Sequence, residues 1–354
     1  MSGLLTFYSE TDNLAVIDLA LNIFRFNQKY HYNKLSFDEN IMLETFWIEK
    51  LKAELLSLQK KYPNALIGIN MEFIHSCQDS SAFLYFTADI PDQSKIFFYN
   101  ILSGCDFQTR MLSDLTTSGA SPTFDKTSDV LFLSKPAGAD GDCLTKCCDR
   151  IILAQMEDIV RGIVIVQEPL ELLASSNVYV DRYVDIKQLF MSPDELLLII
   201  YYMSRHLLTI DKEYDALVAT SKNGAVLASL LGRMIGKEVV YCVNLGPQYA
   251  LPAYAVEQIQ PKDRYVYVYD FICLGTEAKL LYALVTSRHA TLTGGIGVAS
   301  YIPLGNTELG DKHSPLADID CLVDLISAGI PYHVYLQKDA AGPQVISKIT
   351  AIST

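Results

Sequence analysis

The stretch from Tyr265 to Glu277, YVYVYDFICLGTE, combines an acid with a tight turn and is the part of the sequence best suited to chemistry. An apolar run with strand character leads to a single carboxylate, Asp270, and then to a short loop that contains Gly275. Such a loop before a helix directs unpaired N–H groups and the positive end of the helix dipole toward one point. The stretch therefore predicts a site for a phosphorylated ligand.

A second loop of the same type lies earlier in the chain. The short strand predicted at Ala216–Ala219 is followed by TSKNG and then by a helix predicted at Ala225–Ile235. Lys222 stands beside Asn223 and Gly224 at the start of this helix, where a cation can contact a bound anion. The alternative interpretation of Lys222 is a solvated loop lysine.

Both loops belong to an ordered alternation of strands and helices that begins near residue 163. One helix has agreeing start signals, because Ser192 can cap it, Pro193 fits its first position and Glu195 completes a capping box. The alternation predicts an α/β fold with a mostly parallel, doubly wound sheet, whose ligands sit at the carboxyl ends of the strands. The other predictions are a buried strand in GIVIVQEP, strands at 178–184, 238–243, 294–301 and 332–336, helices at 278–287 and 317–327, and an extended loop at 244–261.

The first half of the chain is predicted to be a separate α+β or α/β domain, and no motif in it fixes a chemistry. Apolar spacing indicates a mostly helical segment at 13–26 and a clear helix at 41–61. The predicted strands lie at 65–74, 82–90, 96–102 and 130–133, with a loop at 113–128. The length favours two domains, which we place at residues 1–165 and 166–354.

Other candidate sites in the sequence have simpler structural interpretations. Cys143, Cys147 and Cys148 cluster in GDCLTKCC, but neither a second CxxC nor a nearby His pair accompanies them. We therefore interpret them as partly buried helix thiols and predict no metal site. Glu72 and His75 suit an acid–base pair, although a strand-end histidine is more often solvated. The alternating tyrosines of YVYVY suggest base stacking, yet alternate residues of one strand are usually core.

Composition narrows the class of partner and compartment. The chain has 354 residues and a net charge of −13, which argues against binding nucleic acid through phosphate neutralisation. The N-terminus has no basic segment before an apolar run, and the longest strongly apolar run, Leu196–Met203, is too short to span a bilayer. The eight cysteines show no regular pairing intervals. We expect a cytoplasmic protein with neither a nucleic-acid nor a membrane partner.

The strand–helix series resembles the type I phosphoribosyltransferases, most closely the orotate phosphoribosyltransferase branch. The resemblance covers about Tyr179 to Leu336, roughly half of the chain, with matching order and spacing. It is carried by YVDRYVDIKQLFMSPDELL, YDALVATSKNGAVLASLLGRMIGKEVVYCV and VYDFICLGTEAKLL. The resemblance implies that Asp270 faces a ribose, that the loop of Cys273, Leu274, Gly275, Thr276 and Glu277 holds a 5-phosphate, and that Ser221, Lys222, Asn223 and Gly224 hold a diphosphate.

The sequence departs from the family where anions would be handled. The family has two adjacent acids, and Tyr269 stands in place of one of them. Glu277 puts a carboxylate where a hydroxyl would meet a phosphate dianion, and like charges oppose binding unless the side chain turns outward. Residues 244–260 contain no Lys or Arg, although the branch stabilises its leaving diphosphate with basic residues there. The strand that ends near Tyr301 also lacks the family's arginine.

These departures leave different functions open. The favoured hypothesis is a divergent binding protein that keeps the fold and a sugar-phosphate or nucleotide pocket but is impaired or altered in transfer. The alternative is an active orotate-type transferase that uses phosphoribosyl pyrophosphate and Mg²⁺. A third hypothesis is that the first half supplies the missing basic groups or an activity of its own. The resemblance further implies phosphoribosyl pyrophosphate or a nucleoside monophosphate as ligand, and a homodimer.

Overall fold

The computed structural model divides the chain into two compact units, Met1–Gln155 and Met156–Thr354. It describes residues 3–30, 37, 39–79, 89–109, 113, 122–136, 138–173, 178–210, 213–242, 245, 253–301 and 318–335. The domain boundary expected between residues 165 and 166 stays a prediction. None of the helices in these ranges combines the length and apolar character that crossing a bilayer requires.

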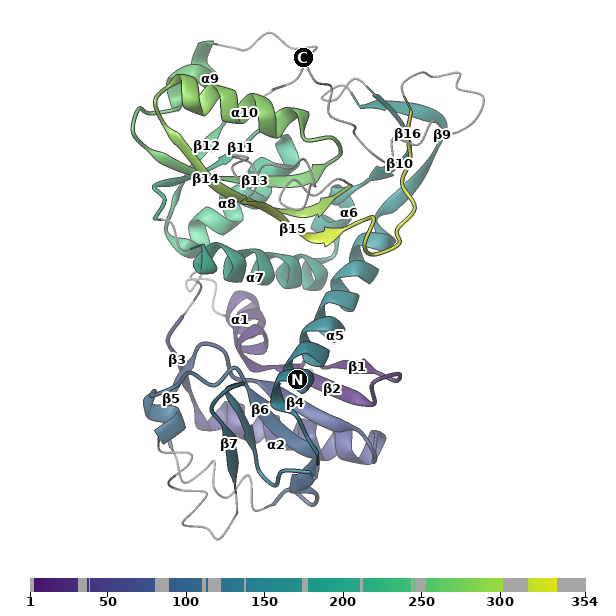
Figure 1. The fold of residues 1–354 in the computed structure, drawn as a ribbon, viewed down its shortest axis with the longest axis vertical. Coiled ribbons are helices and arrows are strands. Elements are labelled where there is room, and N and C mark those ends of the chain that lie inside the picture. The colour runs from purple at the N-terminus through teal and green to yellow at the C-terminus, as the bar shows by residue number, and fades with distance from the viewer. Residues whose placement is uncertain are drawn as a thin grey trace. The chain divides into compact units, whose positions relative to one another are not determined.

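The first unit is built on a mixed six-stranded sheet (Figure 1). Its central strands run parallel, and the outer strands are antiparallel to their neighbours. The strand order is β1 (Phe7–Ser9), β2 (Leu14–Asp18), β4 (Leu66–Asn70), β6 (Ile96–Tyr99), β8 (Val130–Phe132) and β7 (Thr123–Asp125). The other elements are a β3–β5 pair (Ile41–Leu43, Ile74–Cys77), a short η1 (Gln93–Lys95), and helices α1 (Leu19–Tyr30) and α2 (Thr45–Lys61). Helix α5 (Gly141–Gly162) begins in this unit and runs past Gln155 into the second.

Several boundaries predicted in the first unit are wrong. The helical segment at 13–26 begins as β2, and α1 starts only after Asp18, whose carboxylate accepts the N–H of Leu21 at 2.9 Å. The apolar run before Asp18 is buried on every side, a pattern that periodicity cannot assign to helix or strand. The helix at 41–61 begins at Thr45, the loop at 113–128 contains β7, and most of the strand at 82–90 lies outside the described residues.

The cysteines of GDCLTKCC lie on the first turns of α5, as predicted for helix thiols. Cys143 is exposed, whereas Cys148 is buried and its Sγ lies close to Gly68. Burial raises the pKa of the Cys147 thiol, the largest of several influences on it. The acid–base role weighed for Glu72 and His75 stays a prediction.

The second unit confirms the α/β prediction. Its five-stranded sheet is parallel throughout, in the order β12 (Glu238–Tyr241), β11 (Ala216–Ala219), β13 (Arg264–Ile272), β14 (Thr291–Ser300) and β15 (Ile319–Asp324). Helices α7 (Pro193–Thr209) and α8 (Lys222–Ile235) lie on one side of the sheet, and α9 (Ala253–Gln258) and α10 (Thr276–Ser287) lie on the other (Figure 1). The strand–helix alternation therefore produces the doubly wound arrangement expected for it.

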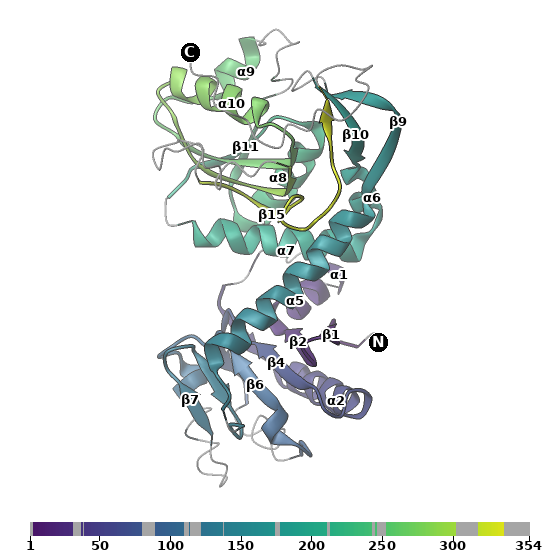
Figure 2. The same ribbon diagram turned by 45° about the vertical axis from the view of Figure 1, so that its right-hand side comes forward.

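A small antiparallel sheet lies beside the parallel one (Figures 1 and 2). It consists of β9 (Val164–Leu173), β10 (Val178–Val184) and β16 (Val334–Tyr335), and α6 (Ile186–Met191) follows β10. The prediction of a short buried strand in GIVIVQEP is wrong in length and in burial. The segment belongs to β9, a longer edge strand with several exposed residues. The extended loop at 244–261 contains α9.

The helix predicted at 317–327 is wrong. This segment forms β15 and then a turn in which Asp324 accepts the N–H of Ile326 at 2.9 Å and the hydroxyl of Ser327 at 2.6 Å. Its apolar residues are spaced irregularly because β15 is an edge strand that is only partly buried. An aspartate that bonds its own following backbone favours a turn over a helix.

The tyrosines of YVYVY are core residues, as predicted. Tyr265, Tyr267 and Tyr269 are buried in one cluster with the apolar face of α10. β14 makes room for them with glycines, and a Cβ on Gly297 would overlap the ring of Tyr269. The Tyr269 hydroxyl donates to the backbone oxygen of Asp320 at 2.5 Å. Tyr269, which the resemblance places at one of the family's two adjacent acids, is therefore part of the core.

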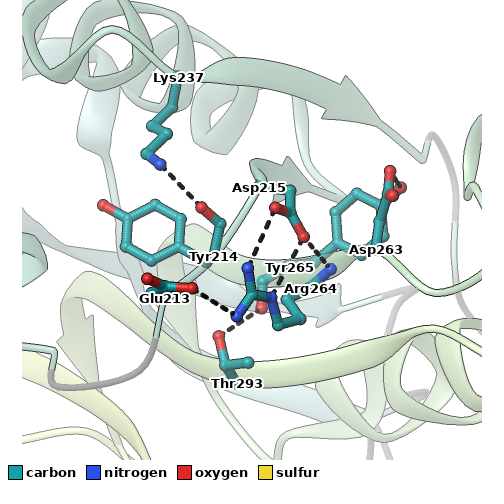
Figure 3. Close-up of polar contacts among 8 residues, drawn as sticks. All are labelled: Glu213, Tyr214, Asp215, Lys237, Asp263, Arg264, Tyr265 and Thr293. Atoms are coloured by element: carbon teal, nitrogen blue, oxygen red, sulfur yellow. Dashed lines mark hydrogen bonds and ion pairs between the residues drawn. The ribbon is translucent and has the colours of Figure 1, made fainter.

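An ion-pair network fixes the starts of β11 and β13, at the opposite end of these strands from their carboxyl ends (Figure 3). The Arg264 guanidinium donates to both oxygens of Asp215 at 3.3 Å and to Glu213 at 3.2 Å. The backbone N–H of Arg264 also donates to Asp215 at 2.8 Å. Lys237 donates to the backbone oxygen of Tyr214 at 2.8 Å. These bonds hold neighbouring strands in register.

Candidate functional site

The two loops singled out in the sequence meet at the carboxyl ends of β11 and β13. The two strands are parallel neighbours, so the segments that follow them emerge at the same edge of the sheet. A pocket of about 160 Å³ lies there. Six of the residues predicted for a site line it: Ser221, Asp270, Cys273, Gly275, Thr276 and Glu277.

Ser221 joins the first loop to the acid of the second. Its Oγ accepts the N–H of Gly224 at 2.9 Å and so caps α8. The same hydroxyl donates to Asp270 Oδ1 at 2.8 Å. One hydroxyl hydrogen thus orients the half-buried carboxylate of Asp270, and the helix cap fixes the hydroxyl. The result is a preorganised acceptor group on the pocket wall.

Glu277 is held inside the pocket by a second chain of hydrogen bonds. The Thr220 hydroxyl donates to Glu277 Oε2 at 2.8 Å, and Thr220 Oγ1 lies 2.8 Å from the hydroxyl of Tyr267. Because a threonine hydroxyl has one hydrogen, which goes to Glu277, Tyr267 must be the donor to Thr220. Thr220 and Tyr267 are both buried. The Glu277 side chain therefore does not turn outward, the one arrangement that would have relieved its repulsion of a phosphate.

The N-terminus of α10 opens onto the same pocket. Gly275 precedes the helix in the left-handed conformation, with φ 73° and ψ 15°, which explains why glycine stands there. As glycine, it has no side chain with which to cap the helix. Thr276, Glu277 and Ala278 form the first turn and line the pocket. Glu277 is thus a carboxylate placed at the positive end of its own helix.

Among the described residues of the wall, burial raises the pKa of three further ionisable groups, those of Tyr183, Tyr267 and Cys273. Burial raises the pKa of Tyr183, and the nearby Asp270 raises it further. Burial also holds the pKa of Tyr267 well above its ordinary value, with Glu277 adding to the shift. The pKa of the Cys273 thiol is raised by burial to about 12. Among the described residues that line the pocket, the charged ones are the acids Asp270 and Glu277.

The other residues predicted for the site do not line the pocket. Lys222 is exposed on the first turn of α8, and Asn223 follows it. Gly224 lets α8 approach β13, because a Cβ there would stand 3.2 Å from the backbone oxygen of Val268. Leu274 lies in the loop before α10. The predicted diphosphate loop therefore contributes only Ser221 to this pocket.

Sequence reasoning missed several residues of the wall. Tyr183 and Val184, at the end of β10, reach the pocket from the small antiparallel sheet, as does Leu173 of β9. No local pattern marks them, because sheet pairing alone brings them there. Thr220, which does not line the pocket but bonds Glu277, could have been found, since a polar residue that directly follows a buried parallel strand lies at the edge where ligands bind.

Magnesium is the cofactor that the resemblance implies for an active enzyme. Mg²⁺ takes oxygen ligands in octahedral geometry, commonly one or two carboxylates with substrate phosphates and water. Asp270 and Glu277 each already accept a hydroxyl hydrogen bond. Within the described residues, no group of three or more His, Cys, Asp or Glu side chains is placed to hold a metal ion. The donor set suits Mg²⁺ only with a ligand that brings its own oxygens.

Neither a protein-family model nor a curated protein matches this chain. Solved structures similar to it include orotate phosphoribosyltransferase from Aeropyrum pernix, with 16% identity, a TM-score of 0.37, and coverage of 50% of this chain and 95% of that one. Adenine phosphoribosyltransferase from Trypanosoma brucei, in complex with AMP, pyrophosphate and ribose-5-phosphate, has 14% identity, a TM-score of 0.38 and coverage of 56% and 88%. UMP synthase from Leishmania donovani has 12% identity, a TM-score of 0.36 and coverage of 78% and 60%.

Proposed function

We propose that the second unit is a phosphoribosyltransferase-like binding module that recognises the ribosyl part of a small ligand and is impaired in transfer chemistry. The observation that carries this proposal is the pocket at the ends of β11 and β13. There, a fixed acceptor pair, Asp270 and Ser221, faces the same space as the turn before α10. The fold of such sheets places ligands at this edge.

Ribose recognition is supported by the hydrogen bonding of the Asp270 carboxylate. Among the described residues, the donor to this carboxylate is the Ser221 hydroxyl, and an ionised carboxylate offers further lone pairs that the hydroxyl groups of a sugar can use. Phosphoribosyl pyrophosphate and nucleoside monophosphates are the ligands that the resemblance suggests. Mg²⁺ would bind with them at Asp270, bringing charge neutralisation, while Ser221 keeps the carboxylate oriented.

Impaired transfer is supported by the charge of the wall. A departing diphosphate gathers negative charge, and preorganised donors or cations usually supply the largest catalytic contribution. The described wall instead presents Asp270 and Glu277, and Glu277 is fixed there by Thr220. Residues 244–260, which follow β12 and correspond to the family's basic loop, contain no Lys or Arg. A cytoplasmic location and a homodimer remain part of the proposal on sequence grounds alone.

The proposal is tested by calorimetric titration of the full chain with phosphoribosyl pyrophosphate, with nucleoside monophosphates and with the corresponding nucleosides, each with and without Mg²⁺. Binding of at least one of these is expected, together with loss of that binding in Asp270→Asn. Asp263→Asn is the matched control, because Asp263 directly precedes the same strand at its other end. If folded protein gives no heat with any of them, the pocket has another purpose. Diphosphate release in the presence of orotate would show that the chain is instead an active transferase.

A further inference from the structure

We infer that Glu277 makes the pocket select a non-phosphorylated ribosyl compound, such as a ribonucleoside, over the corresponding 5′-monophosphate. This inference rests on the proposed function and names its ligand class more closely. It starts from the position of Glu277 on the pocket wall, in the first turn of α10. The carboxylate occupies the kind of place where a helix N-terminus would otherwise attract an anion.

Hydrogen bonds to buried residues fix the position of the Glu277 side chain. Thr220 donates to it at 2.8 Å and in turn accepts from Tyr267 at 2.8 Å. Thr220 is only 3% exposed and Tyr267 only 1%, so neither hydroxyl has water as a ready alternative partner. Swinging Glu277 away would leave the Thr220 hydroxyl without its acceptor in a buried place, which is costly. Tyr267 and Thr220 are therefore positioning residues for this carboxylate.

A phosphate in this pocket would meet the carboxylates of both Asp270 and Glu277. Asp270 and Glu277 both line it, and the neighbouring Tyr183 and Tyr267 stay protonated because burial raises the pKa of each. The positive end of α10 faces its own Glu277, which already offsets the helix dipole. A unit charge about 4 Å from a like charge near a protein surface is disfavoured by well over tenfold, and a phosphate dianion by more.

The same wall suits a neutral ligand that is rich in hydroxyl groups. Carboxylates accept hydrogen bonds and donate none when ionised, so they pair with the hydroxyls of a sugar and reject the acceptor oxygens of a phosphate. Asp270 and Glu277 provide two such acceptors on one wall. Phe271 and Ile272 provide apolar surface in the same pocket. A nucleoside offers both kinds of surface without the repelled charge.

The experiment compares matched ligand pairs that differ by one phosphate. Uridine, cytidine, adenosine and guanosine, each beside its 5′-monophosphate, are titrated calorimetrically into the full chain. For the nucleoside that binds, we expect a Kd at least about tenfold lower than for its monophosphate. Glu277→Gln keeps an acceptor for Thr220 but removes the charge. It should therefore reduce the ratio of the monophosphate Kd to the nucleoside Kd, mainly by lowering the Kd of the monophosphate. Glu238→Gln, an exposed acid on β12, is the control for net charge and should leave the ratio unchanged.

A second pair of variants tests the positioning chain without altering any charge. Tyr267→Phe removes the donor to Thr220 and should bring the Kd values of nucleoside and monophosphate closer together, because Glu277 is then less firmly held in the pocket. Tyr265→Phe removes a hydroxyl from the same face of β13, where it bonds Asp263 at 3.2 Å, and should not change the ratio. This pair of variants also tests the role of Glu277 if Glu277→Gln proves unstable.

The outcomes separate the two proposals. Monophosphate binding as tight as nucleoside binding in the wild type, with a ratio that Glu277→Gln does not alter, would overturn the role of Glu277 and leave the proposed function standing. Absence of binding by every ligand, in both the wild type and Glu277→Gln, would overturn the proposed function and this inference together. The inference about Glu277 is supported if the wild type binds the nucleoside more tightly than the monophosphate and this difference in Kd becomes smaller in Glu277→Gln and Tyr267→Phe. The difference should stay unchanged in the controls Glu238→Gln and Tyr265→Phe.

Discussion

Gly224→Ala is expected to destabilise the second unit, although alanine is the better helix former. Gly224 lies in the first turn of α8, where the helix approaches β13. A Cβ at this position would stand 2.8 Å from Ser221 Oγ, 3.2 Å from the backbone oxygen of Val268 and 3.4 Å from Tyr269 Cα. The last two atoms belong to the backbone of a central strand, so they cannot rotate away and the helix itself must move.

Three contributions set the size of the effect. Forcing an extra methyl group into a packed contact costs about 1–3 kcal/mol. Ser221 must also turn from the added methyl, and losing its cap on the N–H of Gly224 costs about 1 kcal/mol more. Alanine offsets this by about 1 kcal/mol of helix propensity. The net destabilisation is about 2 kcal/mol, which lowers the melting temperature of a domain of this size by roughly 4–8 °C.

The assay is differential scanning calorimetry of the full chain. Gly162→Ala is the control, because it makes the same change at the end of α5, where a Cβ would meet nothing within 4 Å. The control should unfold at the wild-type temperature or slightly above it. If Gly224→Ala behaves like Gly162→Ala, the close approach of α8 to β13 is refuted, and with it the packing reason for this glycine.

Further predictions concern charge, burial and packing elsewhere in the fold. A hydrogen bond from Arg264 lowers the pKa of Asp215, so this pair stabilises the fold above the unfolded-state pKa and the stabilisation is lost as the pH falls through the folded-state pKa. Urea unfolding across the acid range should be less pH-dependent in Asp215→Asn, and an unchanged profile would contradict the pairing. Burial raises the pKa of Cys273 to about 12, whereas Cys143 is exposed, so a thiol reagent at neutral pH should modify Cys143 first in peptide mass spectrometry; equal rates would contradict this. Gly297→Ala should lower the urea midpoint and reduce the free energy of unfolding by at least ~1–3 kcal/mol, since the added methyl would overlap the ring of Tyr269. A wild-type midpoint would contradict the close contact between Gly297 and Tyr269.

The second unit was predictable where local signals and chain order agree. Pro193 begins α7 as its position after Ser192 suggests, although the Ser192 side chain makes no cap bond. The regular exchange of strands and helices was enough to predict a parallel sheet, because crossovers between parallel strands follow few topologies. Gly275 was singled out from its place between a strand and a helix, and it does adopt the left-handed conformation that favours glycine.

The sequence was least informative where pairing with distant segments decides the structure. The residues of β15 predict a helix because an edge strand shows no clean alternation of apolar and polar residues. Nothing in this short segment indicates that it pairs with β14. The pocket shows the same effect, since Tyr183 arrives from β10 and Thr220 acts only through its distant partner Glu277. Local patterns marked the loops, but the long-range hydrogen bonds determine what those loops present.

The central claim, that the pocket at the ends of β11 and β13 binds a ribosyl ligand, is tested most directly by mapping amide chemical shifts of the isotope-labelled full chain during titration with the tightest-binding nucleoside. We predict saturable shifts that concentrate at Ser221, Asp270, Gly275 and Thr276 and that disappear in Asp270→Asn. Shifts that saturate at another surface, or that persist unchanged in Asp270→Asn, would contradict the claim.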